Sequence, residues 1–338
     1  MLTKLEVSGF KNLRDVELDF GPFTCIAGPN ASGKSNLFDA ISFLSSLATG
    51  TFTEACAGVR PCSGSGTVDP QSVFSAAVLE GRENLRLAAE MIVPSQVLDA
   101  FGDPAKPSKT YLRYEVELRV DDGNVRLVRE SLAPLAASNS PIVTAYPTLK
   151  RHITGKRKLP YMSMGSTSSG AECVSVPREE RGRPREIPID RTPRTVLSEL
   201  ASAEYPTLLA ARTEMRSWRF IALEATSMRA PDRLNETPGI DESGAHVPIS
   251  LHSRAEADSD HVLVDLRRDV SDLVDIRSLN LDVDRARQLV ELRAQVGDAP
   301  ELPARSLSDG TLRFLTLAAM GYSTDYVGMI GMEEPENG

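Results

Sequence analysis

The octapeptide GPNASGKS, residues 28–35, constrains the fold of this chain more than any other stretch. It matches the pattern G-x-x-x-x-G-K-[ST], in which backbone N–H groups converge on phosphate oxygens. A short, mostly apolar run, PFTCIAG, leads into it and predicts a strand. Apolar residues at helical spacing follow it and predict a helix: Leu37, Ile41, Leu44 and Leu47. The order strand, glycine loop, helix predicts an α/β fold with a site for nucleotide phosphates.

The residues predicted to bind the nucleotide are Gly28, Pro29, Asn30, Ala31, Ser32, Gly33, Lys34, Ser35 and Asn36. The two glycines permit backbone conformations that a side chain would block. The helix that starts near Lys34 directs its positive end toward the anion. Lys34 is expected to reach the β- and γ-phosphates and to act in catalysis, and the Ser35 hydroxyl is expected to bind Mg²⁺. The predicted cofactors are therefore ATP and Mg²⁺.

The stretch GMIGMEEPENG, residues 328–338, has the pattern of a short strand that delivers two adjacent carboxylates. Glu333 stands where a Mg²⁺ ligand is expected, and Glu334 where a general base or water-positioning acid is expected. The alternative is a pair of acids in a turn before Pro335. Its combination with the glycine loop favours the catalytic interpretation.

A third motif, SLSDGTLRFLTLAA, predicts a helix with Ser308 or Asp309 as its N-cap. Ser308 and Gly310 offer a hydroxyl, free backbone amides and a helix dipole to an anion. A plain N-cap is the alternative. The position of the motif shortly before the two carboxylates favours an anion site.

The rest of the chain is read from periodicity and turn residues. Alternating residues predict a strand, a turn and a strand across residues 2–20, and a hairpin at TYLRYEVELRV and VRLVRESL around DDGN. Residues 50–72 are expected to form an exposed loop, and residues 135–195 an irregular insertion. Helical spacing follows at 194–218 and at 259–274, RFIALEA is expected to be a strand, and LDVDRARQLVELRAQV remains ambiguous between strands and helix.

Composition indicates a soluble globular protein. The net charge is −9, and no apolar run is long enough to span a bilayer. No secretory signal is visible, so we expect a cytoplasmic protein with no membrane partner. The cysteines lack metal or disulfide spacing and are expected to be reduced thiols: Cys25, Cys56, Cys62 and Cys173. The histidines show no ligand arrangement either: His152, His246, His252 and His261.

The segment Lys150–Arg194 carries eleven Lys and Arg against five acids, a local net charge of +6. Such a segment can follow the phosphates of DNA. A solvated loop is the alternative.

Four stretches together, GFKNLRDVELDF, GPNASGKSNLFDAI, LSDGTLRFLTLAA and EEPENG, resemble the ABC-like ATPases of the RecF, structural-maintenance-of-chromosomes (SMC) and OLD type, often called AAA-family ATPases. The resemblance implies a P-loop NTPase head with an N-terminal antiparallel β-subdomain and a helical or irregular insertion. It implies a homodimer that holds ATP between subunits, with Ser308 and Gly310 acting in trans. It places Lys11 and Arg14 near the nucleotide base and leaves Gln71 and Gln96 as alternatives for the glutamine loop.

Relatives of this type continue past EEPENG, so we expect an N-terminal portion of an ATPase head. The expected division is 1–134 with the glycine loop, 135–250 as the insertion, and 251–338 with the signature helix and carboxylate strand. The predicted function is ATP binding and hydrolysis in DNA repair or phage defence, with a nuclease or other effector as partner. The alternative is a nucleotide-gated scaffold with little turnover. No NKxD motif supports GTP, and no nuclease constellation is visible.

Overall fold

The computed structural model describes residues 1–59, 70–179, 182–190, 192–200, 202–258, 261–322 and 328–333. It divides into two compact units, Met1–Trp218 and Arg219–Gly338, and each is described here by itself. The strands of the three larger sheets pair in antiparallel fashion, and helices accompany them, so the fold is mixed α/β. The division into 1–134, 135–250 and 251–338 remains a prediction.

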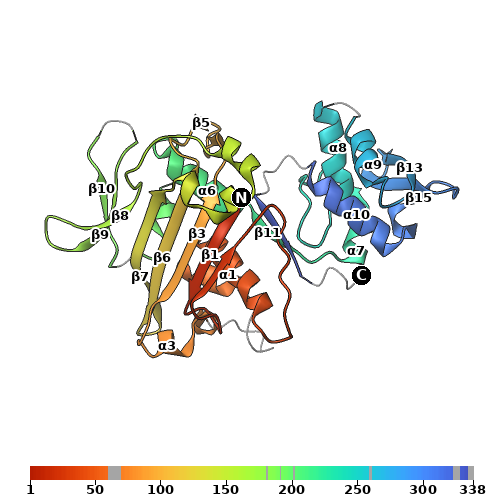
Figure 1. Cartoon of the computed structure of the whole chain (residues 1–338). Helices are drawn as coiled ribbons and strands as arrows, with labels where there is room; N and C mark the ends of the chain where they lie inside the picture. Colours follow the sequence, from red (N-terminus) through yellow and green to blue (C-terminus); the bar gives the residue numbers. More distant parts are fainter. Residues whose placement is uncertain are drawn as a thin grey trace. The chain divides into compact units, whose positions relative to one another are not determined.

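Unit 1 is built on a five-stranded sheet with the order β2-β1-β3-β6-β7 (Figure 1). Its strands are β1 (Leu2–Ser8), β2 (Val16–Asp19), β3 (Leu85–Ile92), β6 (Tyr111–Asp121) and β7 (Asn124–Pro134). The expected strand pair across residues 2–20 and the expected hairpin are both confirmed. Asp122 and Gly123 connect β6 to β7 with φ of 49° and 75°, the left-handed values that a tight hairpin turn requires.

The two faces of this sheet differ because side chains alternate along each strand. Leu5 and Val7 of β1 are buried, whereas Lys4 and Glu6 lie on the opposite face. On that face Arg113 binds Glu6 through two hydrogen bonds of 2.8 and 2.6 Å. Helix α1 (Lys34–Leu47) buries Leu37, Ala40, Ile41, Leu44 and Leu47. Each fully buried leucine of this kind stabilises the fold by about 2 kcal/mol.

The predicted strand at PFTCIAG is wrong: residues 21–29 contain neither helix nor strand. Phe23 in this segment is 85% exposed. A strand needs the backbone hydrogen bonds of a neighbour, and no described strand pairs with these residues.

Short elements surround the sheet of unit 1. They are α2 (Phe52–Ala57), η1 (Pro70–Val73), α3 (Ala76–Leu79), β4 (Val97–Leu98), β5 (Pro104–Ala105), η2 (Ala137–Asn139), α4 (Pro141–Ala145), η3 (Pro147–His152), β8 (Ser163–Ser166), β9 (Glu172–Val176), β10 (Arg185–Pro188), α5 (Val196–Glu199) and α6 (Pro206–Arg216).

Several of these elements correct the sequence expectations. The exposed loop expected at 50–72 contains α2, which begins with a capping box between Thr51 and Glu54. The irregular insertion expected at 135–195 contains a three-stranded sheet, β10-β9-β8, and several helical turns. The capping box is a local signal that was present in the sequence.

Unit 2 contains the remaining elements. They are β11 (Trp218–Ile221), α7 (Ala225–Met228), β12 (Asp232–Arg233), α8 (Val247–Asp258), α9 (His261–Val270), β13 (Ile276–Asp284), β14 (Leu289–Val296), β15 (Leu302–Pro303), η4 (Ala304–Ser306), α10 (Asp309–Met320) and β16 (Met329–Met332). Strand β11 starts at the last residue of unit 1. The ambiguous segment LDVDRARQLVELRAQV lies in β13 and β14, which pair as a hairpin.

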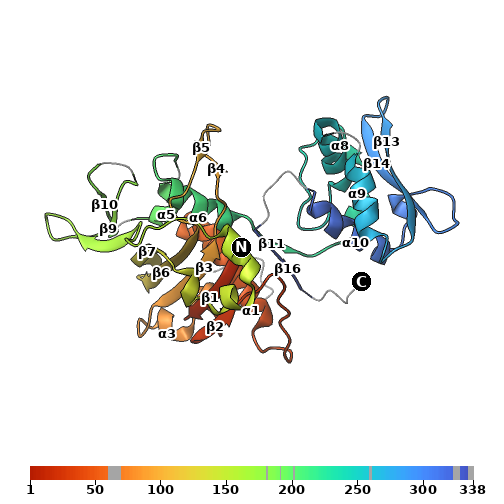
Figure 2. The ribbon, with the colours of Figure 1, turned by 45° about the horizontal axis from the view of Figure 1, so that its top comes forward.

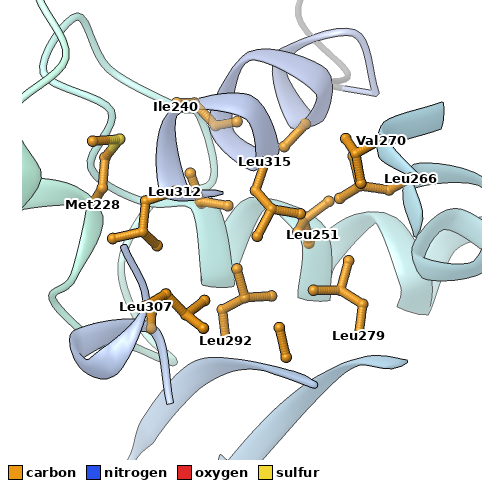
Figure 3. Close-up of a cluster of buried hydrophobic side chains, with 14 of the residues drawn as sticks. Met228, Ile240, Leu251, Leu266, Val270, Leu279, Leu292, Leu307, Leu312 and Leu315 are labelled. Atoms are coloured by element: carbon orange, nitrogen blue, oxygen red, sulfur yellow. The ribbon is translucent and has the colours of Figure 1, made fainter. Parts of the chain in front are cut away.

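The core of unit 2 lies between the helices and this hairpin (Figures 2 and 3). Leu312 and Leu315 of α10, Leu266 of α9, and Leu279 and Leu292 of the hairpin all contribute to it. The strands of unit 2 form a sheet of the order β12-β14-β13, with β15 beside β14, and a separate pair of β11 and β16. Helix α10 therefore has its apolar face fixed by packing, which leaves its N-terminal end to be positioned by polar contacts.

Candidate nucleotide-binding site

The glycine loop lies directly before α1, as predicted. Gly33 has φ of 97°, a left-handed value that glycine adopts without strain. A Cβ atom at this position would lie 3.0 Å from Asn12 Oδ1 and 3.3 Å from Leu13 Cδ2, so the close approach also requires glycine. Ala31 has φ of 64°, and the N–H of Ser32 donates to the carbonyl of Pro29 at 3.3 Å. The loop is thus a tight turn stabilised by its own backbone.

The first turn of α1 presents backbone N–H groups toward this loop. Gly33 is the N-cap residue, and it has no side chain to accept from them. The first turn contains no acidic residue, and residues 28–36 contain neither Asp nor Glu. Uncapped N–H groups and a helix dipole without a competing carboxylate favour a bound anion. The loop and helix therefore suit the phosphates of a nucleotide.

Lys34 lies over the loop. Its Nζ donates to the carbonyl oxygens of Gly28 and Pro29, at 2.7 and 2.9 Å. These two hydrogen bonds hold the ammonium group against the start of the glycine loop. Ser35 is exposed in the first turn of α1, and Asn36 follows it. The structure brings together all the residues predicted for this loop.

The turn after β1 supports the loop through two residues. Asn36 Nδ2 donates to Asn12 Oδ1 at 2.8 Å, and Asn12 is also the residue closest to Gly33. Sequence reasoning missed Asn12, although it lies beside Lys11 in the FKN stretch. Lys11 forms an ion pair of 2.8 Å with Asp39 of α1, and both side chains are nearly buried. Arg14 is exposed.

The segment after residue 69 lies against the same turn. The N–H of Lys11 donates to the carbonyl of Val73 at 2.9 Å, and the N–H of Ser75 donates to that of Gly9 at 2.9 Å. Gln71 lies on this segment, in η1. Gln96 is exposed beside β4, in another part of unit 1. Of the two candidates for the glutamine loop, Gln71 is the one next to the turn that supports the glycine loop.

In unit 2, Ser308 is the N-cap of α10, as predicted. Its Oγ accepts from the N–H of Thr311 at 3.2 Å and lies 2.9 Å from Thr311 Oγ1. Asp309 binds Arg229, which also donates to the carbonyl of Leu307 at 3.2 Å. Gly310 is exposed, and a Cβ there would meet no atom within 4 Å. The start of α10 is therefore fixed by Arg229 and open at Gly310.

The carboxylate strand is confirmed as β16, which ends immediately before Glu333. Glu333 is half-buried. Glu334 lies outside the described residues. The glycine loop belongs to unit 1 and the other two motifs belong to unit 2, so the structure describes each motif within its own unit. The roles of Lys34, Ser35, Glu333 and Glu334 remain predictions.

The cationic residues of the segment 150–194 fall into two groups, according to whether acidic residues lie nearby in the sequence. Arg178 and Arg194 form ion pairs with Glu204 and Glu199, at 2.9 and 3.8 Å. In contrast, residues 131–171 contain no acid at all, and their cationic residues lie in and after η3: Lys150, Arg151, Lys156, Arg157 and Lys158. Arg181 and Arg191 lie outside the described residues.

Residues 150–158, which we call the basic loop, are held in place by contacts with residues 108–110. Gly155 has φ of 88°, and a Cβ there would lie 2.0 Å from the carbonyl oxygen of Ser108. The hydroxyl of Thr110 donates to the carbonyl of His152 at 2.7 Å and accepts from the N–H of Thr154 at 2.7 Å. Lys156 and Lys158, which follow this anchored turn, are exposed.

Two further findings bear on the sequence expectations. Cys25, Cys56 and Cys173 are free thiols, and burial raises the pKa of Cys56 to about 12. Cys62 lies outside the described residues. Among the described helices, none combines the length and the apolar character that a bilayer crossing requires.

Comparison with known proteins places a match at the amino terminus. Residues 1–54 match the RecF/RecN/SMC N terminal domain family. The structural maintenance of chromosomes protein 1 of Schizosaccharomyces pombe is 29% identical over 143 residues, 42% of this chain and 9% of that protein. The OLD nuclease of Thermus scotoductus is 43% identical over 44 residues, 13% of this chain and 8% of that protein.

The Smc chromosome partition protein of Methanocaldococcus jannaschii is 50% identical over 44 residues, 13% of this chain and 4% of that protein. The chain thus spans less than a tenth of the length of these relatives. A solved structure described as the recombination mediator protein RecF with ATP aligns with 95% of this chain and 79% of its own. Its sequence identity is 12% and its TM-score is 0.29, too low to establish a shared overall fold. At its amino terminus, which contains the glycine loop and α1, the chain is similar to ABC-like ATPases of the RecF, SMC and OLD type.

Proposed function

We propose that this chain binds ATP with Mg²⁺ at residues 28–36 and hydrolyses it between two copies of the chain. The observation that carries the proposal is the glycine loop before α1, with Lys34 Nζ held over it and no carboxylate in the first turn. Triphosphate binding at such a loop is electrostatic, because N–H groups, a helix dipole and a lysine all face the anion.

Each predicted residue then has a role. Lys34 neutralises charge on the β- and γ-phosphates, and the Ser35 hydroxyl binds Mg²⁺. Glu333 is the second proposed Mg²⁺ ligand, and Glu334 orients and deprotonates the attacking water. Bound Mg²⁺ supplies Lewis-acid stabilisation of the phosphate oxygens. Asn12 positions Gly33 and Asn36, and Gln71 is the preferred candidate for the glutamine loop.

The open start of α10 supports the second half of the site. Gly310 leaves the helix N-terminus accessible, and Arg229 fixes its position. We assign Ser308 and Gly310 to the nucleotide bound by the other copy. Such a site needs two chains, so the ATPase rate should rise more than linearly with protein concentration.

The test is ATP turnover with Mg²⁺ for the wild-type chain, Lys34→Ala and Glu334→Gln, with oligomeric state read by light scattering. Lys34→Ala should abolish binding, and Glu334→Gln should give an ATP-dependent dimer without turnover. Lys106→Ala, at an exposed lysine of the same unit, is the matched control and should leave the rate unchanged. Equal turnover in Lys34→Ala and wild type would refute the proposal.

The alternative function is a nucleotide-gated scaffold that binds ATP with little turnover. The same experiment separates the two, because Glu334→Gln hardly changes a protein that does not hydrolyse ATP. The relatives' names connect them with chromosomes, partition and a nuclease. We therefore assign the ATPase to DNA repair, chromosome maintenance or phage defence, with a nuclease or other effector protein as partner and a cytoplasmic location.

DNA binding by the basic loop is a second proposed activity, favoured by the exposed Lys156 and Lys158 in an acid-free segment. A Lys156→Ala/Lys158→Ala variant should bind duplex DNA more weakly. Its affinity should also depend less on salt: the slope of log affinity against log salt concentration should fall by about one for each phosphate that a removed lysine neutralised. The control is Arg178→Ala/Arg194→Ala, because both arginines are already paired with glutamates. Equal affinity and equal salt dependence in the two variants would exclude the basic loop.

A further inference from the structure

Three side chains of unit 2 that the nucleotide site does not use converge on one point. Asp232 lies in β12, Glu236 in the loop after it, and His246 immediately before α8. His246 Nδ1 lies 3.2 Å from Asp232 Oδ1 and 3.6 Å from Glu236 Oε2. One ligand atom from each residue lies within 4.8 Å of the other two. This is a mixed set of one imidazole and two carboxylates.

The spacing of these atoms matches the coordination shell of a small transition metal. Zinc binds histidine nitrogen and carboxylate oxygen at about 2.0–2.2 Å, usually with tetrahedral geometry. Tetrahedral ligands at that distance lie about 3.3–3.6 Å apart. The two separations from Nδ1, 3.2 and 3.6 Å, lie within about 0.1 Å of this range. Mg²⁺ prefers oxygen ligands in an octahedron, so an imidazole in the set favours zinc.

The charges also favour a divalent cation. Two carboxylates and one neutral imidazole carry −2 together, which a divalent ion neutralises. The Asp232 side chain is only 5% exposed, so a bound cation would offset the cost of placing its charge away from water. His246 and Glu236 are 36% and 37% exposed, so the cluster is open to solvent on one side. An ion can enter there, and a water molecule can complete its coordination.

Backbone contacts hold the three residues in place independently of one another. Asp232 Oδ2 accepts from the N–H of Ile249 at 3.0 Å, which fixes this carboxylate at the first turn of α8. Glu236 Oε2 accepts from the N–H of Arg233 at 3.0 Å. The carbonyl of His246 accepts from the N–H and the hydroxyl of Ser250, at 3.1 and 2.6 Å. The ligand atoms are therefore preorganised.

We infer that Asp232, Glu236 and His246 form a binding site for one zinc ion, or another divalent transition metal of the same preference. The ion links β12 to the start of α8 across the loop of residues 234–246. The ligands are separated by 4 and 10 positions along the chain, a spacing that resembles none of the short zinc motifs. Only the folded chain brings them together.

The test uses the full chain, freed of metal by chelation and titrated with Zn²⁺ alone, with bound metal measured by elemental analysis and stability by thermal denaturation. His246→Asn removes the imidazole, and asparagine tolerates the φ of 67° at this position. Glu236→Gln removes one charge. Asp232 is left unchanged because its contact with Ile249 supports α8.

The wild-type chain should bind one Zn²⁺ and unfold at a higher temperature with it. Both variants should lose affinity at least about tenfold, the loss seen even for residues outside the metal's direct ligands. The matched control is His252→Asn, since His252 lies 3.8 Å from the carboxylate of Glu256 and, among the described residues, belongs to no three-ligand group. It should bind as the wild type does. A wild-type chain that binds no Zn²⁺, or a His246→Asn variant that binds it equally, would overturn the inference and leave a purely hydrogen-bonded cluster.

Discussion

Lys11 Nζ and Asp39 Oδ2 form an ion pair of 2.8 Å whose side chains are only 5% and 8% exposed. The pair links the turn after β1 to helix α1, five residues beyond the start of that helix. Lys11 is therefore occupied by a structural contact, whereas the resemblance to ABC-like ATPases placed it near the nucleotide base.

Asp39→Ala should reduce the free energy of unfolding, by at most about 3–5 kcal/mol, because it removes a carboxylate that pairs with a nearly buried ammonium group. The measurement is urea denaturation, with Glu83→Ala as a control at an exposed acid that should change stability by less than about 0.5 kcal/mol. The double variant Lys11→Met/Asp39→Leu should be more stable than Asp39→Ala alone. If the single variant resembled the control, the ion pair would not support α1.

Gly33→Ala and Gly310→Ala should have opposite effects on the free energy of unfolding. At Gly33, alanine must adopt a left-handed conformation, at about 1–2 kcal/mol, and its Cβ meets Asn12 at 3.0 Å. At Gly310, alanine lies in the first turn of a helix with no atom within 4 Å, and should stabilise α10 by about 0.5–1 kcal/mol. Binding of a fluorescent ATP analogue should be lost in Gly33→Ala and retained in isolated Gly310→Ala subunits. Normal binding by Gly33→Ala would show that the loop does not hold the phosphates.

Glu130 should make stability depend on pH. Its carboxylate accepts from the N–H groups of Val196 and Leu197 at 2.6 and 2.9 Å and from the Tyr114 hydroxyl at 3.0 Å. Burial nevertheless raises the pKa of Glu130 from 4.5 to about 7. Between these values the folded chain holds a proton that the unfolded chain has released, so the free energy of unfolding falls as pH rises.

Glu130→Gln removes this titration. The difference in unfolding free energy between wild type and Glu130→Gln should therefore fall as pH rises from 4.5 to about 7 and be constant outside that range. Urea denaturation at a series of pH values measures it, and other titrating groups cancel in the difference. A difference that stays constant across this window would mean that Glu130 is already charged in the fold there.

Glu214 should control the environment of the only tryptophan. Its Oε1 accepts from Trp218 Nε1 at 2.9 Å and also pairs with the amino group of Met1, and Glu214 is fully buried. Glu214→Ala removes the acceptor of the buried Trp218 indole N–H, whereas the Met1 amino group keeps its hydrogen bond to the carbonyl of Ile92 at 2.7 Å. The free energy of unfolding should therefore fall by about 1–3 kcal/mol for the indole donor.

Tryptophan fluorescence during urea denaturation reports on this change directly, since the chain has one Trp. Glu204→Ala is the control, because Glu204 forms an exposed ion pair with Arg178, worth at most about 1 kcal/mol. Equal effects of the two substitutions would show that Glu214 is not a structural acceptor.

Local sequence patterns predicted those features of the fold and of the candidate site that depend on residues adjacent in the sequence. The glycine loop before α1, the Asp122–Gly123 hairpin turn and the Ser308 cap were all predicted, because backbone conformation at these points follows from a few adjacent residues. The helical spacing of α1 was predicted for the same reason. The capping box of α2 was an equally local signal that was overlooked.

Other features depend on contacts between residues that are far apart in the sequence, and these were decided by the tertiary structure. The apolar run PFTCIAG has the composition of a strand, yet no described strand pairs with it, so it has no ladder of hydrogen bonds. Asn12 reaches the glycine loop, and Glu236 and His246 meet Asp232, only because packing brings separate segments together. The sequence by itself determined the residues of the glycine loop to which we assign phosphate binding, since that chemistry lies in eight consecutive residues. The supporting contacts and the second cluster of ligands arise from long-range packing, which no local pattern encodes.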